Sequence, residues 1–244
     1  MELVRRRVSV IVTLGLPTAL AAKKATATIP IVFETGDDPV TTGLVSAFNR
    51  PGGNVTGISL LSPEMATKRL AFLRELVPKA DVMGVLVNTT NPSNERQLSE
   101  LQAAARTIMV QLRVVRATSA QDIDAAFETF AQQRIGALLV GSDPLFFSRR
   151  SQLIVLAARH AIPTSYPDRD FSVAGGLMSY AANRTEGLIQ TGMYAGRILK
   201  GEKPANLPVL LPIKFELVIN LQTAKTLALT VPLTLQVAAD EIIE

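Results

Sequence analysis

The sequence contains no cysteine and no tryptophan, and only 5% of its 244 residues are aromatic. The absence of cysteine excludes disulfide frameworks, cysteine-ligated zinc and thiol nucleophiles. There is one histidine, His160, and no G-x-S-x-G, phosphate-binding loop or G-x-G-x-x-G motif. His160 is expected at the end of a helix, where it caps carbonyl groups. We therefore expect no catalytic residue, no metal and no cofactor.

Long apolar runs are also lacking, so no transmembrane helix is expected. The N-terminus nevertheless imitates a signal peptide, with basic Arg5–Arg7, apolar Val8–Leu14 and small residues at 18–22. This apolar run is short and is interrupted by polar residues, glycine and proline. We favour a buried strand over Val8–Thr13, followed by a turn at Gly15 and a helix.

Charge and composition are those of an ordinary globular protein. The net charge is +4, hydrophobic residues make up 48% and charged residues 19%. Basic residues are scattered rather than arranged in a stripe with aromatics, so no nucleic-acid partner is expected. The length allows one large domain or two small ones.

Short β-branched runs alternate with longer helical stretches along the whole chain. Several of the runs are almost wholly apolar, such as Ala137–Val140, which is typical of strands buried on both faces of a parallel sheet. The sequence therefore predicts an α/β fold. The predicted strands are Val8–Thr13, Ile29–Glu34, Val55–Leu60, Val82–Asn88, Leu112–Ala117, Ala137–Gly141, Thr164–Tyr166, Leu177–Tyr180 and Ile213–Ile219.

The stretches between these strands are amphipathic helices. In the predicted helix Glu64–Val77, leucines mark the apolar face, whereas Lys68, Arg69, Arg74 and Glu75 are assigned to the polar face. Ser119 with Asp122 forms a capping box that opens a later helix. A further long helix is predicted over Asn183–Lys200.

Polar and small residues follow several of the predicted strands. Ligands of open parallel sheets bind outside the carboxyl ends of the strands, so these residues are the candidates for ligand contact. The alternative is that they only cap helices and form turns. Arg169 and Arg184 are the nearest candidates for binding a ligand carboxylate. The candidate ligand-binding residues are Thr13, Gly15, Thr18, Asp38, Asn88, Asn91, Asp143, Tyr166 and Tyr180.

Four segments carry a resemblance to a known family. They are Ile29–Val40, the turn-rich Asn49–Gly57 (Asn-Arg-Pro-Gly-Gly-Asn-Val-Thr-Gly), Asn220–Lys225 and Ala239–Ile242. With them, the whole chain resembles the ABC transporter substrate-binding protein family, which has the type 1 periplasmic-binding fold.

The resemblance implies two Rossmann-like lobes with parallel sheets, joined by hinge strands, with a ligand between them. The expected lobes are residues 1–60 plus 177–212, and residues 61–176 plus 213–244 with a crossing C-terminal segment. The expected hinge passages are Leu60–Pro63, Asp168–Gly176 and Leu211–Ile213.

The resemblance also places Met1 just before the third strand of the first lobe. Family members usually begin with a signal sequence and two further strand–helix units. The first lobe is therefore expected to be incomplete and to expose an apolar sheet edge, which would favour self-association.

The function implied is that of the solute-binding component of an ABC importer. Such a protein binds a small polar or amino-acid-like ligand without chemistry, lies in the periplasm or is anchored outside the cytoplasm, and delivers its ligand to an ABC permease. Two alternatives remain open. One is a cytoplasmic small-molecule sensor or regulatory protein on the same fold, and the other is an enzyme on a doubly wound sheet.

Overall fold

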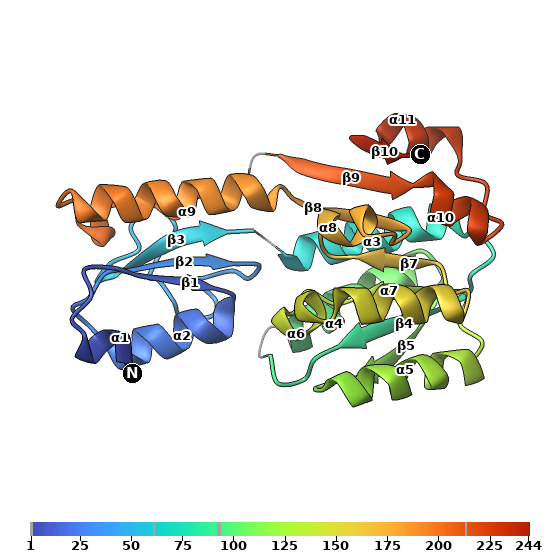
Figure 1. The fold of residues 1–244 in the computed structure, drawn as a ribbon, viewed down its shortest axis with the longest axis horizontal. Helices are drawn as coiled ribbons and strands as arrows, with labels where there is room; N and C mark the ends of the chain where they lie inside the picture. Colours follow the sequence, from blue (N-terminus) through green and yellow to red (C-terminus); the bar gives the residue numbers. More distant parts are fainter. Residues whose placement is uncertain (1, 61, 92–93, 213) are drawn as a thin grey trace. The chain divides into compact units, whose positions relative to one another are not determined.

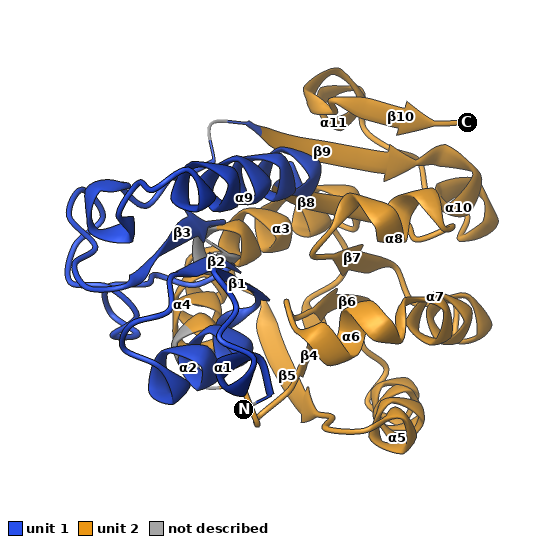
Figure 2. Ribbon diagram, turned by 60° about the vertical axis from the view of Figure 1, so that its left-hand side comes forward, with its two compact units in different colours: residues 1–62, 182–214 blue, residues 63–181, 215–244 orange. Residues whose placement is uncertain are grey.

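The computed structural model describes residues 2–60, 62–91, 94–212 and 214–244. The chain forms two compact α/β units, shown in different colours in Figure 2. Unit 1 consists of Met1–Ser62 and Ala182–Lys214, and unit 2 of Pro63–Ala181 and Phe215–Glu244. The chain therefore passes between the units three times.

Unit 1 is a small parallel sheet with helices on both faces. Its strands lie in the order β1-β2-β3, with α2 on one face and α9 on the other (Figure 1). Phe33 of β2 packs toward α2, and Val32 packs against Tyr194 and Ile198 of α9. The elements are β1 (Ile11–Leu14), β2 (Ile31–Thr35), β3 (Val55–Ser59), α1 (Glu2–Arg5), α2 (Leu16–Ala25), α9 (Arg184–Leu199) and the 3-10 turn η1 (Pro204–Asn206).

The stretch that imitates a signal peptide forms β1 and α2 in the structure, as the strand–turn–helix interpretation predicts. Strand β1 begins at Ile11 rather than Val8. Gly15 is the N-cap of α2 and has φ of 83°, a left-handed conformation that favours glycine. Pro17 follows in the first helical turn, where its missing N–H is not needed.

The turn-rich segment Asn49–Gly57 contains the turn before β3 and the first residues of that strand. The side-chain amide of Asn54 donates to the carbonyls of Thr26 (3.2 Å) and Ile29 (2.7 Å), and so ties this turn to the loop before β2. Gly57 lies opposite Phe33 in the β2–β3 pair. A Cβ at Gly57 would collide with the backbone oxygen of Phe33 and lie 2.7 Å from its nitrogen, so only glycine fits.

Strand β1 is an edge of the unit 1 sheet and is only half covered. Strands β2 and β3 are buried along their whole length, whereas β1 alternates between buried and exposed residues. Val12 is 48% exposed and Leu14 43%. Both share the sheet face on which α9 lies, but α9 packs on β2 and β3. Strand β1 thus exposes two apolar side chains on one face of the sheet.

Unit 2 is built on one seven-stranded sheet, in the order β10-β9-β8-β7-β6-β4-β5. Its strands are β4 (Val82–Val87), β5 (Gln111–Arg116), β6 (Ala137–Val140), β7 (Thr164–Tyr166), β8 (Met178–Ala182), β9 (Phe215–Asn220) and β10 (Glu241–Ile243). Its helices are α3 (Ser62–Leu76), α4 (Asn94–Thr107), α5 (Ala120–Gln132), α6 (Pro144–Ser148), α7 (Arg150–Arg159), α8 (Arg169–Val173), α10 (Leu221–Thr226) and α11 (Leu233–Ala238).

Both faces of the unit 2 sheet are buried. Leucines of α3 and α4 pack with α10 and α11 against one face, and Phe127, Phe130 and Phe146 pack with α7 and α8 against the other. Ser119 caps α5 by accepting from the Asp122 N–H at 3.2 Å, and the Asp122 carboxylate accepts from the Thr118 N–H at 2.8 Å, which makes a loose form of the predicted capping box. Hydrogen bonds from Thr118 and Ser119 lower the pKa of the Asp122 carboxyl.

Strands β8 and β9 are adjacent and antiparallel, unlike the other paired strands of the sheet whose register is described. The Asn220 N–H, at the end of β9, donates to the Leu177 carbonyl before β8, at 2.9 Å. The Asn183 N–H, after β8, donates to the Lys214 carbonyl before β9, at 3.2 Å. These bonds connect the start of each strand to the end of the other.

The position of β8 corrects the expected lobe boundary. Residues 177–180 were expected in the first lobe, but β8 pairs with β7 inside the unit 2 sheet. The expected hinge at Asp168–Gly176 is also wrong, because these residues form α8 and a loop of unit 2, and the chain crosses after Ala181. The crossing after Ser62 lies within the expected passage Leu60–Pro63, and the crossing after Lys214 lies just past the expected passage Leu211–Ile213. Leu61 and Ile213 themselves lie outside the described residues.

The polar face predicted for α3 contains one error. Arg69 was assigned to solvent together with its charged neighbours, but its side chain is 1% exposed. Helical periodicity treats every charged residue as exposed. Here the arginine instead turns inward to a backbone carbonyl at the end of β6.

Candidate functional site

Asp143 is the centre of a buried polar cluster at the carboxyl edge of the unit 2 sheet. One carboxylate oxygen accepts from the Asn88 side-chain amide at 2.9 Å and from the Leu145 N–H at 2.9 Å. The other accepts from the Asn91 amide at 3.1 Å. Asp143, Asn88 and Asn91 are all buried. Three predicted site residues that follow two different strands are thus brought together.

Local turn chemistry builds this cluster. Asp143 is the N-cap of α6, with Pro144 in the first turn, so the strand–helix junction fixes its carboxylate. The Asn88 side-chain oxygen Oδ1 accepts from the N–H and the hydroxyl of Thr90, at 3.0 and 2.8 Å. That turn at the end of β4 directs the Asn88 amide to Asp143. The cluster therefore joins the ends of β4 and β6.

In unit 1, Thr13, Gly15 and Thr18 lie at the junction of β1 and α2. The Gly15 N–H donates to the Glu34 carbonyl at 2.7 Å, which holds the ends of β1 and β2 together. The Thr18 hydroxyl donates to the carbonyls of Leu14 and Gly15, at 2.6 and 2.8 Å. Thr13 is buried, and its hydroxyl meets no hydrogen-bond partner among the described residues.

Glu34 is a buried carboxylate for which the sequence predicts only a place at the end of a strand. Its side chain lies at the carboxyl end of β2, and an oxygen lies 3.5 Å from Nε of Arg184. Gly187, one turn into α9, leaves room above it, since a Cβ there would lie 3.5 Å from the carboxylate. The signal available in the sequence was a glutamate that ends an otherwise apolar strand. Arg184, a candidate for a ligand carboxylate, is thus held beside Glu34 through its Nε.

The loop after β2 adds a second group of polar residues. Asp38 accepts from the N–H groups of Val40 and Thr41, at 2.8 and 3.2 Å, so it caps the turn there. The Thr35 hydroxyl donates to the Asp37 carboxylate at 2.9 Å, and the Ser59 hydroxyl donates to the Asp37 carbonyl at 2.8 Å. Asp38 lies in unit 1 and is half-buried.

The two candidate tyrosines differ in burial, since Tyr166 is buried and Tyr180 is half-buried. Tyr166 is 1% exposed and stacks on Phe171 with ring centroids 4.8 Å apart, and this burial raises its pKa. Its side chain therefore has almost no exposed surface, and its role in ligand binding stays a prediction. Tyr180 lies in the middle of β8 and packs edge-on against Phe72 of α3 at 5.1 Å, with Lys68 above its ring.

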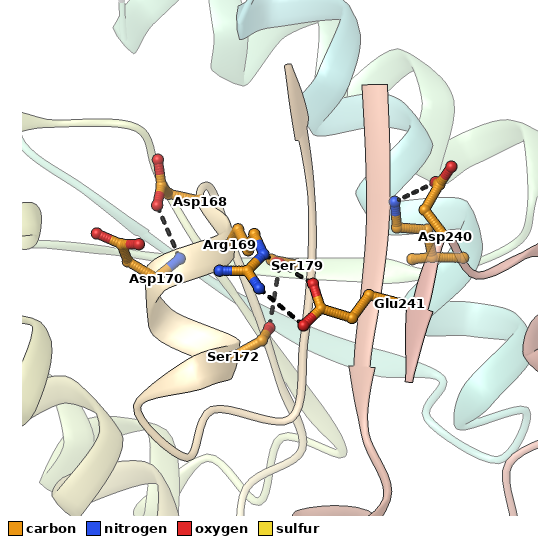
Figure 3. A network of polar contacts seen from close by, with 8 residues as sticks. Asp168, Arg169, Asp170, Ser172, Ser179, Asp240 and Glu241 are labelled. Carbon is orange, nitrogen blue, oxygen red and sulfur yellow. Dashed lines mark hydrogen bonds and ion pairs between the residues drawn. The ribbon is translucent and has the colours of Figure 1, made fainter. Parts of the chain in front are cut away.

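Arg169, the other candidate for a ligand carboxylate, holds the C-terminal strand instead. Its guanidinium donates through two nitrogens to both oxygens of Glu241, each at 2.7 Å (Figure 3). This pairing raises the pKa of Arg169. Beside it, the Ser172 hydroxyl donates to Ser179 at 3.0 Å, and Asp240 accepts from the Leu217 N–H at 2.9 Å. This network fixes β10 to the rest of unit 2.

Three further observations concern the histidine, metal binding and membrane-spanning helices. His160 is the C-cap residue of α7, with its Nε2 3.6 Å from a Glu128 oxygen. Within the described part of the chain, no group of three or more histidine, aspartate or glutamate residues is arranged to hold a metal ion. No helix of that part is long and apolar enough to cross a membrane.

Comparison with solved structures defines the class of protein. A conserved domain protein from Vibrio cholerae is 28% identical, with a TM-score of 0.90 over 99% of this chain and 80% of that chain. A protein from Streptococcus pneumonia, solved in complex with L-Trp, has a TM-score of 0.86 at 24% identity, over 96% of this chain and 81% of that one. The fold is that of solute-binding proteins with the type 1 periplasmic-binding architecture.

The family model of the ABC transporter substrate binding protein matches residues 1–243. The chain belongs to this family. The tyrosine-binding protein of Clostridioides difficile is 30% identical over 219 residues. That match covers 89% of this chain and 62% of the relative, so the chain spans less than two thirds of the relative's length. Proteins of this family bind solutes, are not enzymes, and are typically extracellular or periplasmic.

Proposed function

We propose that this protein is the solute-binding component of an ABC importer, and that it binds an amino acid or similar zwitterion without chemical change. The observation that carries the proposal is the gathering of buried polar side chains at the carboxyl ends of the parallel strands in both units. These include Asp143 with its two asparagines in unit 2, and Glu34 with Arg184 in unit 1. Ligands of open α/β sheets bind at this edge.

The chemistry at these edges suits a zwitterion. Glu34 and Asp143 supply carboxylates for an ammonium group, and Arg184 together with the N–H groups at the start of α2 supplies donors for a carboxylate. The relatives named above support an amino acid as the ligand class. The working residue set in unit 1 is Thr13, Gly15, Thr18 and Asp38, with Glu34 and Arg184 added.

Export and delivery complete the proposal. We place the protein outside the cytoplasm, in the periplasm or held at the membrane, where it would present its ligand to an ABC permease. The family match supports this assignment. The alternative of a cytoplasmic sensor on the same fold is not favoured by that match.

Titration with the twenty L-amino acids tests the proposal. At least one of them, with the aromatic ones tried first, is expected to raise the free energy of unfolding. A ligand at one hundred times its Kd adds about 2.7 kcal/mol, which gives a clear rise in melting temperature. The same ligand is measured by isothermal titration calorimetry.

The matched control is the N-acetyl amide of the same amino acid, which keeps the side chain and removes both charges. It is expected to bind at least tenfold more weakly, because a charge-assisted hydrogen bond is worth more than a neutral one. If no amino acid shifts the melting temperature at millimolar concentration, the proposal is wrong. Equal binding of the neutral analogue would refute the zwitterion.

We also propose that the protein self-associates through the outer edge of β1. An edge strand with exposed apolar residues is a template for pairing. A double substitution, Val12→Lys with Leu14→Lys, places charges on this edge. It is expected to convert a concentration-dependent oligomer into a monomer, as measured by size-exclusion chromatography with light scattering.

Leu233→Lys is the control for this experiment, because Leu233 is also an exposed leucine but lies on α11 of unit 2 rather than on β1. It is expected to leave the oligomer unchanged. A wild-type protein that stays monomeric at high concentration, or an equal effect of the control, would exclude this edge as the contact.

A further inference from the structure

Arg69 is a buried cation that makes one hydrogen bond to the described residues. Its side chain, from α3, is 1% exposed, and Nη1 donates to the Val140 carbonyl at 2.7 Å. Among the described residues, the buried Nε has no hydrogen-bond partner and no carboxylate pairs with the guanidinium. Burial lowers the pKa of Arg69 to about 9. A charge that is buried in this way is costly, so its retention calls for a reason.

The reason lies in the ladder between β6 and β7. These strands are parallel, with Leu138 opposite Thr164, and the Leu138 N–H donates to the Pro163 carbonyl at 2.8 Å. The bonds of a parallel ladder repeat every two residues. The Val140 carbonyl is therefore in line to accept from the N–H of residue 167.

Residue 167 is a proline and has no N–H to give. The β6–β7 pairing accordingly ends at Leu139 and Ser165. Without another donor, the Val140 carbonyl would be left unsatisfied at the buried end of β6. Arg69 supplies that donor from the neighbouring helix.

Val140 leads directly into the turn that carries Asp143. In this turn the Gly141 N–H donates to the Leu86 carbonyl at 2.9 Å, and the Leu145 N–H donates to Asp143. A Cβ at Gly141 would lie 2.9 Å from the Leu86 oxygen, so the turn has little room to move. The last carbonyl of β6 thus sets the direction in which the chain leaves the sheet.

We propose that Arg69 is a positioning residue that replaces the backbone donor missing at Pro167 and holds the turn from Val140 to Asp143 in place. The Asp143 cluster is then presented at the edge of the sheet. This inference rests on the proposed function for the role of that cluster in binding a ligand, but not for the arrangement of the turn.

A pair of substitutions tests this arrangement without any ligand. Arg69→Met keeps the length and packing of the side chain but removes the donor. Amide hydrogen exchange at Gly141 and Leu145 is expected to become at least tenfold faster. Pro167→Ala restores an N–H at position 167, and in the double variant it is expected to return exchange at both amides to the wild-type rate.

The restoration separates positioning from a general structural role, because an alanine at 167 cannot replace the packing or charge of Arg69. Arg74→Met is the control on the same helix, since Arg74 pairs with Asp81 at 3.2 Å, and it is expected to leave exchange at Gly141 and Leu145 unchanged. If Arg69→Met does not fold, recovery of the fold in the double variant supports the inference. Unchanged exchange in Arg69→Met, or no recovery in the double variant, overturns it.

Ligand affinity provides the second readout. If the wild-type protein binds an amino acid, Arg69→Met is expected to weaken binding at least tenfold, and the double variant to bind like the wild type. Unchanged affinity in Arg69→Met would remove the link to the site. Absence of binding by the wild-type protein would contradict the proposed function, while the exchange measurement still decides the role of Arg69.

Discussion

Replacing Gly57 by alanine is expected to destabilise unit 1 by about 4 kcal/mol or more. The new Cβ would overlap the backbone of Phe33, which lies opposite in the β2–β3 pair. A backbone group cannot move aside as a flexible side chain can, so the two strands must separate. Because β2 is the central strand of a three-stranded sheet, the damage spreads through the unit. Urea unfolding measures the loss.

Gly192→Ala is the matched control for this substitution. Gly192 lies on α9 in the same unit, and nothing lies within 4 Å of a Cβ built there. Alanine is the better helix former, so this variant is expected to gain roughly 0.5–1 kcal/mol. A Gly57→Ala protein as stable as the wild type would show that the β2–β3 pair is not as close as described.

Asp143→Ala is expected to lose about 3–5 kcal/mol of stability and most ligand affinity. The substitution removes the acceptor of three donors, namely the Asn88 amide, the Asn91 amide and the Leu145 N–H. A buried donor left without a partner costs about 1–3 kcal/mol. Relaxation of the asparagines keeps the total below the sum of three such losses. Urea unfolding and calorimetric titration measure the two effects.

Two variants separate the contribution of Asp143 as a helix cap from its contribution through the asparagine bonds. Ser119→Ala removes an N-cap of α5 that accepts a single backbone N–H, and is expected to cost about 1 kcal/mol. Asp143→Asn keeps one acceptor oxygen and is expected to fall between the wild type and Asp143→Ala. If Asp143→Ala costs no more than Ser119→Ala, the asparagine bonds contribute nothing and the cluster has no structural role.

The strands of this fold were largely accessible to sequence reasoning. The predicted strand Thr164–Tyr166 matches β7 at both ends, and most other predicted strands match the observed ones to within a few residues. Short apolar runs predict these strands well because the strands of a parallel sheet are buried on both faces. Strand β10 was missed, since Glu241–Ile243 is short and lies at a sheet edge. The sheet to which β8 belongs was assigned wrongly, because that depends on pairing with strands distant in the sequence.

The candidate site is harder to predict, because some of its residues depend on partners that are distant in the sequence. Asp143 was recognised because it follows a strand and caps a helix, and both signals are local. Arg69 was not recognised, because a charged residue in an amphipathic helix is assigned to solvent. Its partner is the carbonyl of Val140, seventy-one positions away, and the need for that partner arises from a proline still further along the chain. Such a relation appears only when the strand register is known.

The antiparallel β8–β9 pair has a consequence for modular evolution and for engineering. The Asn183 N–H and the Lys214 carbonyl bring the two ends of residues 182–214 together at one point. Topologically, this stretch, with α9, is an insertion into the tip of a hairpin of unit 2. Antiparallel strands need only a two-residue connection, so the larger unit keeps an unbroken sheet whatever is carried between β8 and β9. We therefore expect that residues 182–214 can be replaced by another segment at this point without breaking the sheet of unit 2.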